Sequence, residues 1–315
     1  MSVTVLIADP GAADYQRQLR ERFAHVQFCA ATDQAALTEG IVDADVLVSF
    51  AMELDAQMLE RAVKLRWIQL LSTGTDRITP LLRGRSDIVL TSARGIHGAP
   101  VSELALLFML ALARRFPSLL RNQVERRWIR SDATLLEGKT VGIAGIGVIG
   151  AQIAKRSQAF GMRTIAFGSA PRPVQHVDEF YSYDELGLWA PKLDMLVIAT
   201  PLRPSTRGMF DARIFRAMKS SAFVINVGRG AVVNEADLIA ALQEKRIAGA
   251  AIDAFAEEPL SPTSPFWSLE NVIVTPHVGG LHDQYTARAV GLIETNLEAF
   301  LAGHTEQMLN RVIAN

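Results

Sequence analysis

Three polar residues of this chain have side chains whose chemistry would combine into one reaction. Arg229 stands between glycines in NVGRGAVV, Glu258 precedes a proline in DAFAEEP, and His277 follows a proline in NVIVTPHVGG. A protonated histidine can give a proton to a carbonyl oxygen, and a carboxylate on its other ring nitrogen fixes the tautomer and favours the charged ring. An arginine can bind a carboxylate and polarise a carbonyl. Together the three suit the reduction of a 2-keto acid by hydride.

Each of these residues also has a structural interpretation when it is taken alone. Arg229 could cap a turn, Glu258 could be a solvated loop acid, and His277 could be a packed polar residue. All three follow or end segments that read as strands, and ligands of open α/β sheets bind outside the carboxyl ends of the strands. We therefore expect the three to face one crevice, and the joint pattern favours the chemical interpretation.

A glycine pattern precedes these residues in KTVGIAGIGVIGAQIAKRSQAFG, between an apolar stretch and an amphipathic one. Gly145 would allow a tight turn, Gly147 would let the backbone approach a pyrophosphate, and Gly150 would let helix and strand pack closely. The N–H groups of Val148 and Ile149 would bind the diphosphate at the positive end of the helix. The pattern predicts a dinucleotide-binding turn, and a turn without a ligand is the alternative.

The segment RTIAFGSAPRP bears on which dinucleotide would bind. A carboxylate that holds the adenosine ribose is expected roughly 20 residues past the glycines, and Gly168 or Ser169 occupies that place. Such a carboxylate would repel a 2′-phosphate, whereas Ser169 and Arg172 could bind one. The segment favours NADP over NAD, and a polar loop with an ordinary surface arginine is the alternative.

The elements that must position these residues are short apolar segments that alternate with helical ones. We expect strands at 3–9, 26–31, 44–50, 65–71, 87–93, 139–146, 163–167, 194–200, 221–227, 249–255 and 271–277. Helical patterns cover 12–23, 55–63, 101–128 and 283–302. This alternation predicts parallel sheets covered on both faces. Two α/β units joined by the long helix 101–128 are the simplest organisation, with boundaries near 98–100 and 283–290.

Composition excludes several classes of protein. Lysine and arginine total 32 against 33 acidic residues, so no basic excess points to nucleic acid or an anionic membrane. The longest apolar run, 104–113, is too short to span a bilayer. Cys29 is the only cysteine, so an intrachain disulfide is impossible and no metal site is expected. The start MSVTVLIADP lacks the features of a signal peptide, and we expect a cytoplasmic protein.

These motifs occur in an order that resembles the D-isomer-specific 2-hydroxyacid dehydrogenase family. The resemblance covers essentially the whole chain and is strongest from about 135 to 281. The matching segments are LEGKTVGIAGIGVIG, ATPLRPSTRGMFDARIF, MKSSAFVINVGRGAVVNEADLIAAL, GAAIDAFAEEPL and SPFWSLENVIVTPHVGG. The resemblance implies an α/β fold with two Rossmann-like domains and a cleft between them. A flavodoxin-like substrate domain would comprise 1–98 and 285–315, and a dinucleotide-binding domain would comprise 99–284.

The resemblance also implies roles for individual residues. Arg229, Glu258 and His277 would be catalytic, with Glu258 chosen over Glu257 because it adjoins the proline. Substrate would contact Arg229, His277 and, in LLSTGTD, the N–H groups of Thr73 and Gly74. His97, in SARGIHGAPVSE, is interpreted as packing rather than as a substrate contact. The implied cofactor contacts beyond the glycine turn are Ser169, Arg172, Thr200, Pro201, Val227, Gly228, Arg229, Asp253, His277 and Gly279.

Members of the family usually form dimers through the long helix and the loop after it, so the resemblance implies a homodimer. Trp128 lies in that region and could reach toward a partner subunit. NAD-dependent members of the family carry an aspartate at the place of 168–169, and this chain does not. In this respect the chain resembles NADP-linked glyoxylate and hydroxypyruvate reductases. Our leading hypothesis is therefore a D-specific reductase of small 2-keto acids that uses NADP(H).

Two alternatives remain open on the same fold. Phosphite oxidation is compatible with the three catalytic residues, whereas formate oxidation is disfavoured, because those enzymes pair the histidine with a glutamine and Glu258 stands here. A redox-sensing, NAD(P)-binding protein like the transcriptional corepressors is the second alternative. Such proteins carry interaction tails, and we expect none here, because the chain starts at its first strand and ends soon after its last helix.

Overall fold

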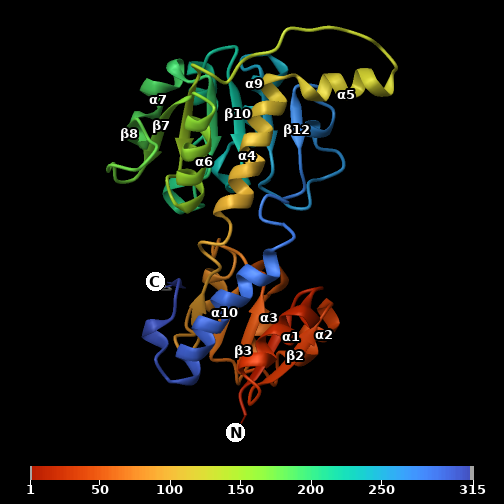
Figure 1. The fold of residues 1–315 in the computed structure, drawn as a ribbon, viewed down its shortest axis with the longest axis vertical. Coiled ribbons are helices and arrows are strands. Elements are labelled where there is room, and N and C mark those ends of the chain that lie inside the picture. Colours follow the sequence, from red (N-terminus) through yellow and green to blue (C-terminus); the bar gives the residue numbers. More distant parts are fainter. Residues whose placement is uncertain (1, 313–315) are drawn as a thin grey trace. The chain divides into compact units, whose positions relative to one another are not determined.

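The computed structural model describes residues 2–312 of the chain. They divide into two compact units: unit 1 comprises 2–97 and 282–312, and unit 2 comprises Gly98–Leu281. Figure 1 shows that each unit is a sheet with helices packed against it. The predicted α/β class, with two Rossmann-like units built on parallel sheets, is confirmed. No helix among residues 2–312 has both the length and the apolar character that crossing a bilayer requires.

Unit 1 is built on a six-stranded sheet in the order β13-β5-β4-β3-β1-β2. The strands pair in parallel, except that β13 runs antiparallel to β5. They are β1 (Thr4–Ala8), β2 (Gln27–Ala31), β3 (Val46–Ser49), β4 (Trp67–Leu70), β5 (Val89–Thr91) and β13 (Arg311–Val312). The helices are α1 (Ala12–Arg22), α2 (Gln34–Gly40), α3 (Ala56–Arg61) and α10 (Tyr285–Leu301).

Strand β1 illustrates why this sheet needs helices on both faces. Val5 and Ile7 belong to a buried cluster with α1 and α10, whereas Leu6 and Ala8 belong to a second cluster with α2 and α3. Successive side chains of a strand point to opposite faces, so a strand that is apolar at every position must be covered on both. The local pattern of the sequence thus determined the layers.

Unit 2 is built on a seven-stranded, all-parallel sheet in the order β12-β11-β10-β9-β6-β7-β8. The strands are β6 (Thr140–Ala144), β7 (Arg163–Gly168), β8 (Glu179–Ser182), β9 (Met195–Ile198), β10 (Phe223–Asn226), β11 (Gly249–Ile252) and β12 (Val272–Val274). The helices are α4 (Gly98–Ala113), α5 (Phe116–Val124), α6 (Val148–Ala159), α7 (Leu186–Trp189), α8 (Ala212–Ala217) and α9 (Glu235–Gln243). The strand order reverses between β6 and β9, where open α/β sheets bind ligands.

The prediction of one long helix over 101–128 was wrong. Helix α4 ends at Ala113, and Arg115 adopts a left-handed backbone with φ of 53° before α5 begins. Pro117 lies in the first turn of α5, where its missing N–H and rigid ring prevent the first helix from continuing. A second left-handed residue, Arg126 with φ of 56°, follows α5, so Trp128 is not helical.

Strands β8 and β13 were not predicted. Strand β8 is an edge strand with the sequence EFYS, and all four of its side chains are half-buried. Strand β13 has only two residues. Neither segment carries an apolar run, because an edge strand is partly open to water and its identity depends on the neighbouring strand.

Candidate active site

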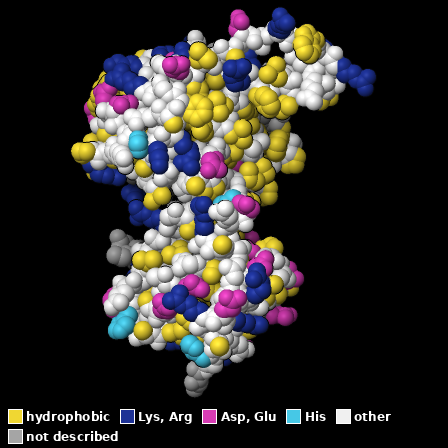
Figure 2. All heavy atoms as spheres, viewed as in Figure 1, with side chains coloured by type: hydrophobic (Ala, Val, Ile, Leu, Met, Phe, Trp, Pro, Cys, Tyr) yellow, Lys and Arg dark blue, Asp and Glu magenta, His cyan; other side chains and the backbone are white. Residues whose placement is uncertain are grey.

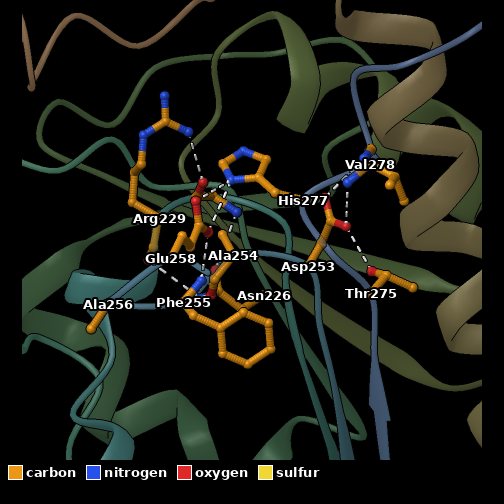
Figure 3. A network of polar contacts seen from close by, with 12 residues as sticks. Asn226, Arg229, Asp253, Ala254, Phe255, Ala256, Glu258, Thr275, His277 and Val278 are labelled. Atoms are coloured by element: carbon orange, nitrogen blue, oxygen red, sulfur yellow. Dashed lines mark hydrogen bonds and ion pairs between the residues drawn. The ribbon is translucent and has the colours of Figure 1, made fainter. Parts of the chain in front are cut away.

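Three loops at the carboxyl edge of the sheet in unit 2 carry the predicted catalytic residues. Arg229 follows β10, Glu258 lies in the loop after β11, and His277 follows β12. Strands β10, β11 and β12 are neighbours in the sheet, so the loops that follow them share one edge. Figure 3 shows that the side chains of these three residues converge. The structure therefore brings the predicted residues together.

His277 and Glu258 form the central pair. The ring Nδ1 of His277 lies 2.9 Å from Oε2 and 3.0 Å from Oε1 of Glu258. A carboxylate can only accept a hydrogen bond, so Nδ1 carries a proton and is the hydrogen-bond donor to Glu258. Nε2 is the ring nitrogen left for another molecule, and the side chain of His277 is 38% exposed, so solutes can reach it. This geometry suits a histidine that exchanges a proton at Nε2.

The environment of Glu258 keeps its carboxyl group charged. Burial acts to raise its pKa, but the hydrogen bonds from His277 and from the Phe255 N–H, together with the charges of His277 and Arg229, outweigh burial and lower the pKa below its ordinary value. The Phe255 N–H donates to Oε1 at 2.9 Å. A carboxylate that stays negative stabilises positive charge on the adjacent ring.

The loop that carries Arg229 is anchored by Asn226, the last residue of β10. Asn226 is buried, and its Oδ1 accepts from the N–H of Gly228 at 3.1 Å. Its Nδ2 donates to the carbonyl oxygens of Arg229 and Ala254, at 3.3 and 3.2 Å. One amide therefore ties the arginine loop to the end of β11. The guanidinium group also donates from Nη1 to the carbonyl oxygen of Gly228 at 3.0 Å.

Gly230 is required because two backbones meet at this point. A Cβ at position 230 would lie 1.8 Å from the carbonyl carbon of Phe255, far inside any contact that real side chains make. The arginine loop can therefore pack against the loop of Glu258 only with glycine here. In the same loop, the Ala256 N–H donates to the carboxylate of Glu235 at 2.7 Å. Burial raises the pKa of Glu235, and the charge of Glu258 raises it further.

Asp253 holds the loop that carries His277. It is 3% exposed, and its carboxylate accepts from the Thr275 hydroxyl at 2.6 Å and from the N–H groups of Val278 and Gly279 at 2.9 Å each. These donors bracket His277, whose backbone is left-handed with φ of 53°. A non-glycine residue in this region costs on the order of 1 kcal/mol and persists where its surroundings hold it. Asp253 supplies those surroundings (Figure 3).

The predicted glycine turn lies between β6 and α6. Gly145 has a left-handed φ of 97°, and a Cβ at Gly150 would lie 2.2 Å from the carbonyl oxygen of Gly145. A Cβ at Gly147, by contrast, would meet no atom within 4 Å beyond its chain neighbours. Gly147 is the N-cap of α6, and no side chain caps this helix. The space beside Gly147 and the uncapped N–H groups at Val148 and Ile149 fit a dinucleotide pyrophosphate.

The remaining predicted cofactor contacts lie around this turn. A Cβ at Gly145 would lie 2.7 Å from the Thr200 nitrogen, and one at Gly228 would lie 2.9 Å from the Thr200 carbonyl oxygen. The loop after β9, with Thr200 and Pro201, therefore packs between the glycine turn and the loop of Val227 and Gly228. The predicted set, apart from the Thr73 loop, lies along the carboxyl edge of one sheet.

Ser169 and Arg172 follow β7 and are exposed. Arg172 donates from Nη2 to the carbonyl oxygen of Ile146 at 3.2 Å, so its guanidinium lies beside the glycine turn. The guanidinium carbon also lies 5.7 Å from the ring centroid of Phe180. No acidic residue occupies 168–171, so this strand end has no carboxylate to oppose a phosphate.

In unit 1, Thr73 and Gly74 lie in the loop after β4. The Thr73 hydroxyl lies 2.8 Å from Nδ1 of His97. His97 is buried, as packing requires, but both of its ring nitrogens have hydrogen-bond partners, so it does more than fill space. The sequence interpretation of His97 captured its burial and missed this network.

Sequence reasoning also missed Asn226, Thr275 and Glu235, which hold the three loops of unit 2. A signal was available for the first two, because each is a polar residue that ends or directly follows an apolar strand at the edge where ligands bind. Glu235 lies in the first turn of α9, where an acid is ordinary, so its contact with Ala256 left no mark in the sequence.

Comparison with known proteins shows the family of this chain. Residues 106–279 match the model of the D-isomer specific 2-hydroxyacid dehydrogenase, NAD binding domain. The chain is 32% identical to a D-3-phosphoglycerate dehydrogenase of Methanocaldococcus jannaschii over 98% of its own length, although it spans only 59% of that relative. It is also 32% identical to a glyoxylate/hydroxypyruvate reductase A of Arabidopsis thaliana, over 96% of this chain and 97% of that one.

Solved structures lead to the same class. A D-isomer specific 2-hydroxyacid dehydrogenase family protein of Aeromonas salmonicida superposes with a TM-score of 0.91 at 29% identity, over the full length of both chains. An NADPH-dependent glyoxylate/hydroxypyruvate reductase of Sinorhizobium meliloti, solved with NADP and sulfate, gives 0.85 at 26% identity, over 100% of this chain and 99% of that one. The chain belongs to the D-isomer specific 2-hydroxyacid dehydrogenase family and is an oxidoreductase of that class.

Proposed function

We propose that this protein reduces small 2-keto acids, such as hydroxypyruvate or glyoxylate, to D-2-hydroxy acids with NADPH. The observation that carries the proposal is the pairing of His277 Nδ1 with both oxygens of Glu258, because it leaves Nε2 for a substrate carbonyl. The relatives named glyoxylate/hydroxypyruvate reductase support the choice of substrate.

The nicotinamide, when bound, supplies a hydride to the keto carbon. As the carbon–oxygen double bond becomes single, negative charge grows on the oxygen, and His277 donates the Nε2 proton to it. The imidazole is then neutral, and Glu258 holds its Nδ1 proton throughout. Arg229 polarises the same carbonyl and stabilises its developing charge. The product is the 2-hydroxy acid, and the reverse reaction returns the proton to Nε2.

For the cofactor, we propose that the N–H groups of Val148 and Ile149 bind the pyrophosphate beside Gly147, in the turn formed by Gly145 and Gly150. The nicotinamide half would contact Thr200, Pro201, Val227, Gly228, Arg229, Asp253, His277 and Gly279. Asp253 would act there chiefly through the loop of His277, because three donors already engage its carboxylate.

The preference for NADPH rests on the strand end after β7. Ser169 and Arg172 are exposed there, the guanidinium lies beside the glycine turn, and no carboxylate opposes a 2′-phosphate. Arginine binds phosphate through a planar fork of donors. A structural relative solved with NADP supports this assignment. In unit 1, we propose that the N–H groups of Thr73 and Gly74 bind the substrate carboxylate.

We also infer that the protein forms a homodimer through α5 and the segment after it. Figure 2 shows hydrophobic side chains gathered on the face of unit 2 that carries α4 and α5. Helix α5 has nine residues and none of them is buried. A helix this short is not stable alone in water. Its apolar side chains and those beyond it are exposed, namely Phe116, Leu119, Leu120, Val124, Trp128 and Ile129. A second copy would cover them.

The experiment that tests the proposed function measures loss of nicotinamide absorbance with hydroxypyruvate and then glyoxylate, using NADPH and NADH at equal concentration. We expect turnover of at least one acid and a strong preference for NADPH. Equal use of both cofactors, or a preference for NADH, would show that the segment GSAPRP does not select for the 2′-phosphate. Absence of turnover, with nucleotide-dependent capture of a protein partner, would favour the redox-sensor alternative.

A further inference from the structure

The buried His97 connects the proposed carboxylate loop, 71–74, to α10. His97 is 8% exposed, and its Nδ1 lies 2.8 Å from the Thr73 hydroxyl oxygen and 3.2 Å from the Ala93 carbonyl oxygen. Its Nε2 lies 3.3 Å from the hydroxyl oxygen of Tyr285, the first residue of α10. The two rings also meet edge-on, with centroids 5.6 Å apart. The ring of His97 therefore touches the loop on one side and the helix on the other.

The partners of Tyr285 determine the role of Nε2 of His97. The hydroxyl of Tyr285 donates to the carbonyl oxygen of Leu71, which can only accept. That hydroxyl has one proton, so its oxygen accepts from Nε2 of His97. Nδ1 of His97 faces both the Thr73 hydroxyl oxygen and the Ala93 carbonyl oxygen, so the Thr73 hydroxyl is paired with the ring in either tautomer. The Thr73 hydroxyl is therefore engaged by His97.

The other polar groups of the loop are held as well. The Ser72 carbonyl accepts from the Ala93 N–H at 3.0 Å, and the Ser72 hydroxyl donates to the Gly74 carbonyl at 3.0 Å. This bracing uses carbonyls and hydroxyls, but it does not use the N–H groups of Thr73 and Gly74. Among residues 2–312 neither N–H group has a hydrogen-bond acceptor, and successive backbone N–H groups in a turn form a concave anion site.

We propose that His97 and Tyr285 are positioning residues for substrate, which hold loop 71–74 in the shape that binds a carboxylate through its N–H groups. The inference rests on the proposed function, because it assigns the loop to the carboxylate of the 2-keto acid. Tyr285 fixes the loop at the Leu71 carbonyl, and His97 fixes it at the Thr73 hydroxyl. Neither side chain needs to touch the substrate.

The place of these residues in the chain determines which readout is needed. His97 is the last residue of unit 1 before the chain passes into unit 2, and Tyr285 follows shortly after the chain returns at His282. A change at either residue could therefore affect more than the loop. Binding of NADPH depends on unit 2, so it separates a local effect on the carboxylate loop from a general disturbance.

The test compares Tyr285→Phe, His97→Gln and Thr73→Val with the unaltered protein, by steady-state kinetics with hydroxypyruvate and NADPH. Tyr285→Phe keeps the ring and removes only the hydroxyl, so it is the least disruptive change. We expect Tyr285→Phe and Thr73→Val each to raise the KM for hydroxypyruvate about two- to tenfold, the equivalent of one hydrogen bond. We expect kcat and the Kd of NADPH to change less than twofold, because the loss falls on substrate binding.

Two further variants sharpen the comparison. Thr73→Ser keeps the hydroxyl, so it should recover most of the KM that Thr73→Val loses. Tyr15→Phe removes a hydroxyl from another buried tyrosine of the same hydrophobic cluster, which is 1% exposed against 9% for Tyr285 and lies outside this network, and it should leave KM unchanged. An unchanged KM in Tyr285→Phe and Thr73→Val, or a Thr73→Ser variant as poor as Thr73→Val, would overturn the positioning role while leaving the proposed function intact. An unaltered protein that reduces neither keto acid would overturn both.

Discussion

Nδ1 of His277 lies within 3.0 Å of both carboxylate oxygens of Glu258, although the two residues come from loops after different strands. The pairing determines the tautomer of the ring and leaves a single nitrogen, Nε2, for chemistry. Of the two adjacent acids 257 and 258, Glu258 is the one whose carboxylate accepts from the ring.

We expect His277→Gln to lower kcat by about 10²- to 10⁴-fold, because the variant cannot transfer a proton to the carbonyl oxygen. Binding of NADPH should be retained, since the glycine turn is untouched. Stopped-assay kinetics and a fluorescence titration of NADPH would measure the two effects. The matched control is His304→Gln, which changes an exposed histidine in unit 1. Equal activity of both variants would exclude His277 as the proton donor.

Glu258→Gln should lower kcat about 10- to 100-fold, the equivalent of one charged hydrogen bond. It also removes the charge that stabilises the protonated ring, so the alkaline fall in the rate of reduction should begin at lower pH. The pKa of Glu258 is lowered in the folded protein, so its contribution to stability is present at neutral pH and is lost as the pH falls through that lowered value.

Two pH profiles test these expectations for Glu258. The first is the pH dependence of kcat/KM, and the second is the pH dependence of the free energy of unfolding, each compared with Glu257→Gln. The difference in stability between Glu258→Gln and the unaltered protein should shrink on acidification. A difference that grows on acidification would contradict the lowered pKa.

Asp253→Asn and Thr275→Val test whether the left-handed backbone at His277 depends on the hydrogen bonds to the carboxylate of Asp253. The side-chain amide introduced by Asp253→Asn could accept with one oxygen only, so at least one of the three donors would lose its partner. We expect kcat to fall at least tenfold, because misplacement of a catalytic group is costly. The control Asp194→Asn changes a carboxylate of unit 2 that accepts from Thr140 and Lys219. It should lower Tm without lowering kcat of the folded enzyme.

Arg172→Ala should raise the KM for NADPH by about tenfold or more and leave the KM for NADH unchanged, since only NADPH carries the 2′-phosphate. The control is Arg213→Ala, whose side chain is 85% exposed in the same unit and pairs with Asp211. Initial rates across a range of each cofactor provide the measurement. A parallel rise for both cofactors would mean that Arg172 supports the glycine turn rather than a phosphate.

The double variant Leu120→Glu/Val124→Glu should convert a dimer into monomers, because it puts charge on the exposed apolar face of α5. Val124 is 84% exposed and Leu120 is 47% exposed in the single chain. Sedimentation velocity measures the change. Val63→Glu, at a position 75% exposed in unit 1, is the matched control and should leave the assembly unchanged. A monomeric unaltered protein would show that a second copy does not cover α5.

The sequence alone determined the features that depend on local pattern. Apolar strands with helices between them specified two parallel sheets, because a strand that is apolar on both faces must be covered on both. The spacing of Gly145, Gly147 and Gly150 specified the turn before α6, since close backbone contacts there exclude a Cβ at Gly150. The residue types at 229, 258 and 277 indicated the reaction, because few side chains can perform those steps.

Only the tertiary structure decided how those residues are held. The end of α4 at Ala113 depends on a left-handed backbone at Arg115, and the edge strand β8 depends on pairing with β7. Asn226, Asp253 and His97 bind groups that lie far along the chain or on other loops. A buried polar side chain must find partners wherever the folded backbone places them, and such partners leave no periodic trace in a single sequence.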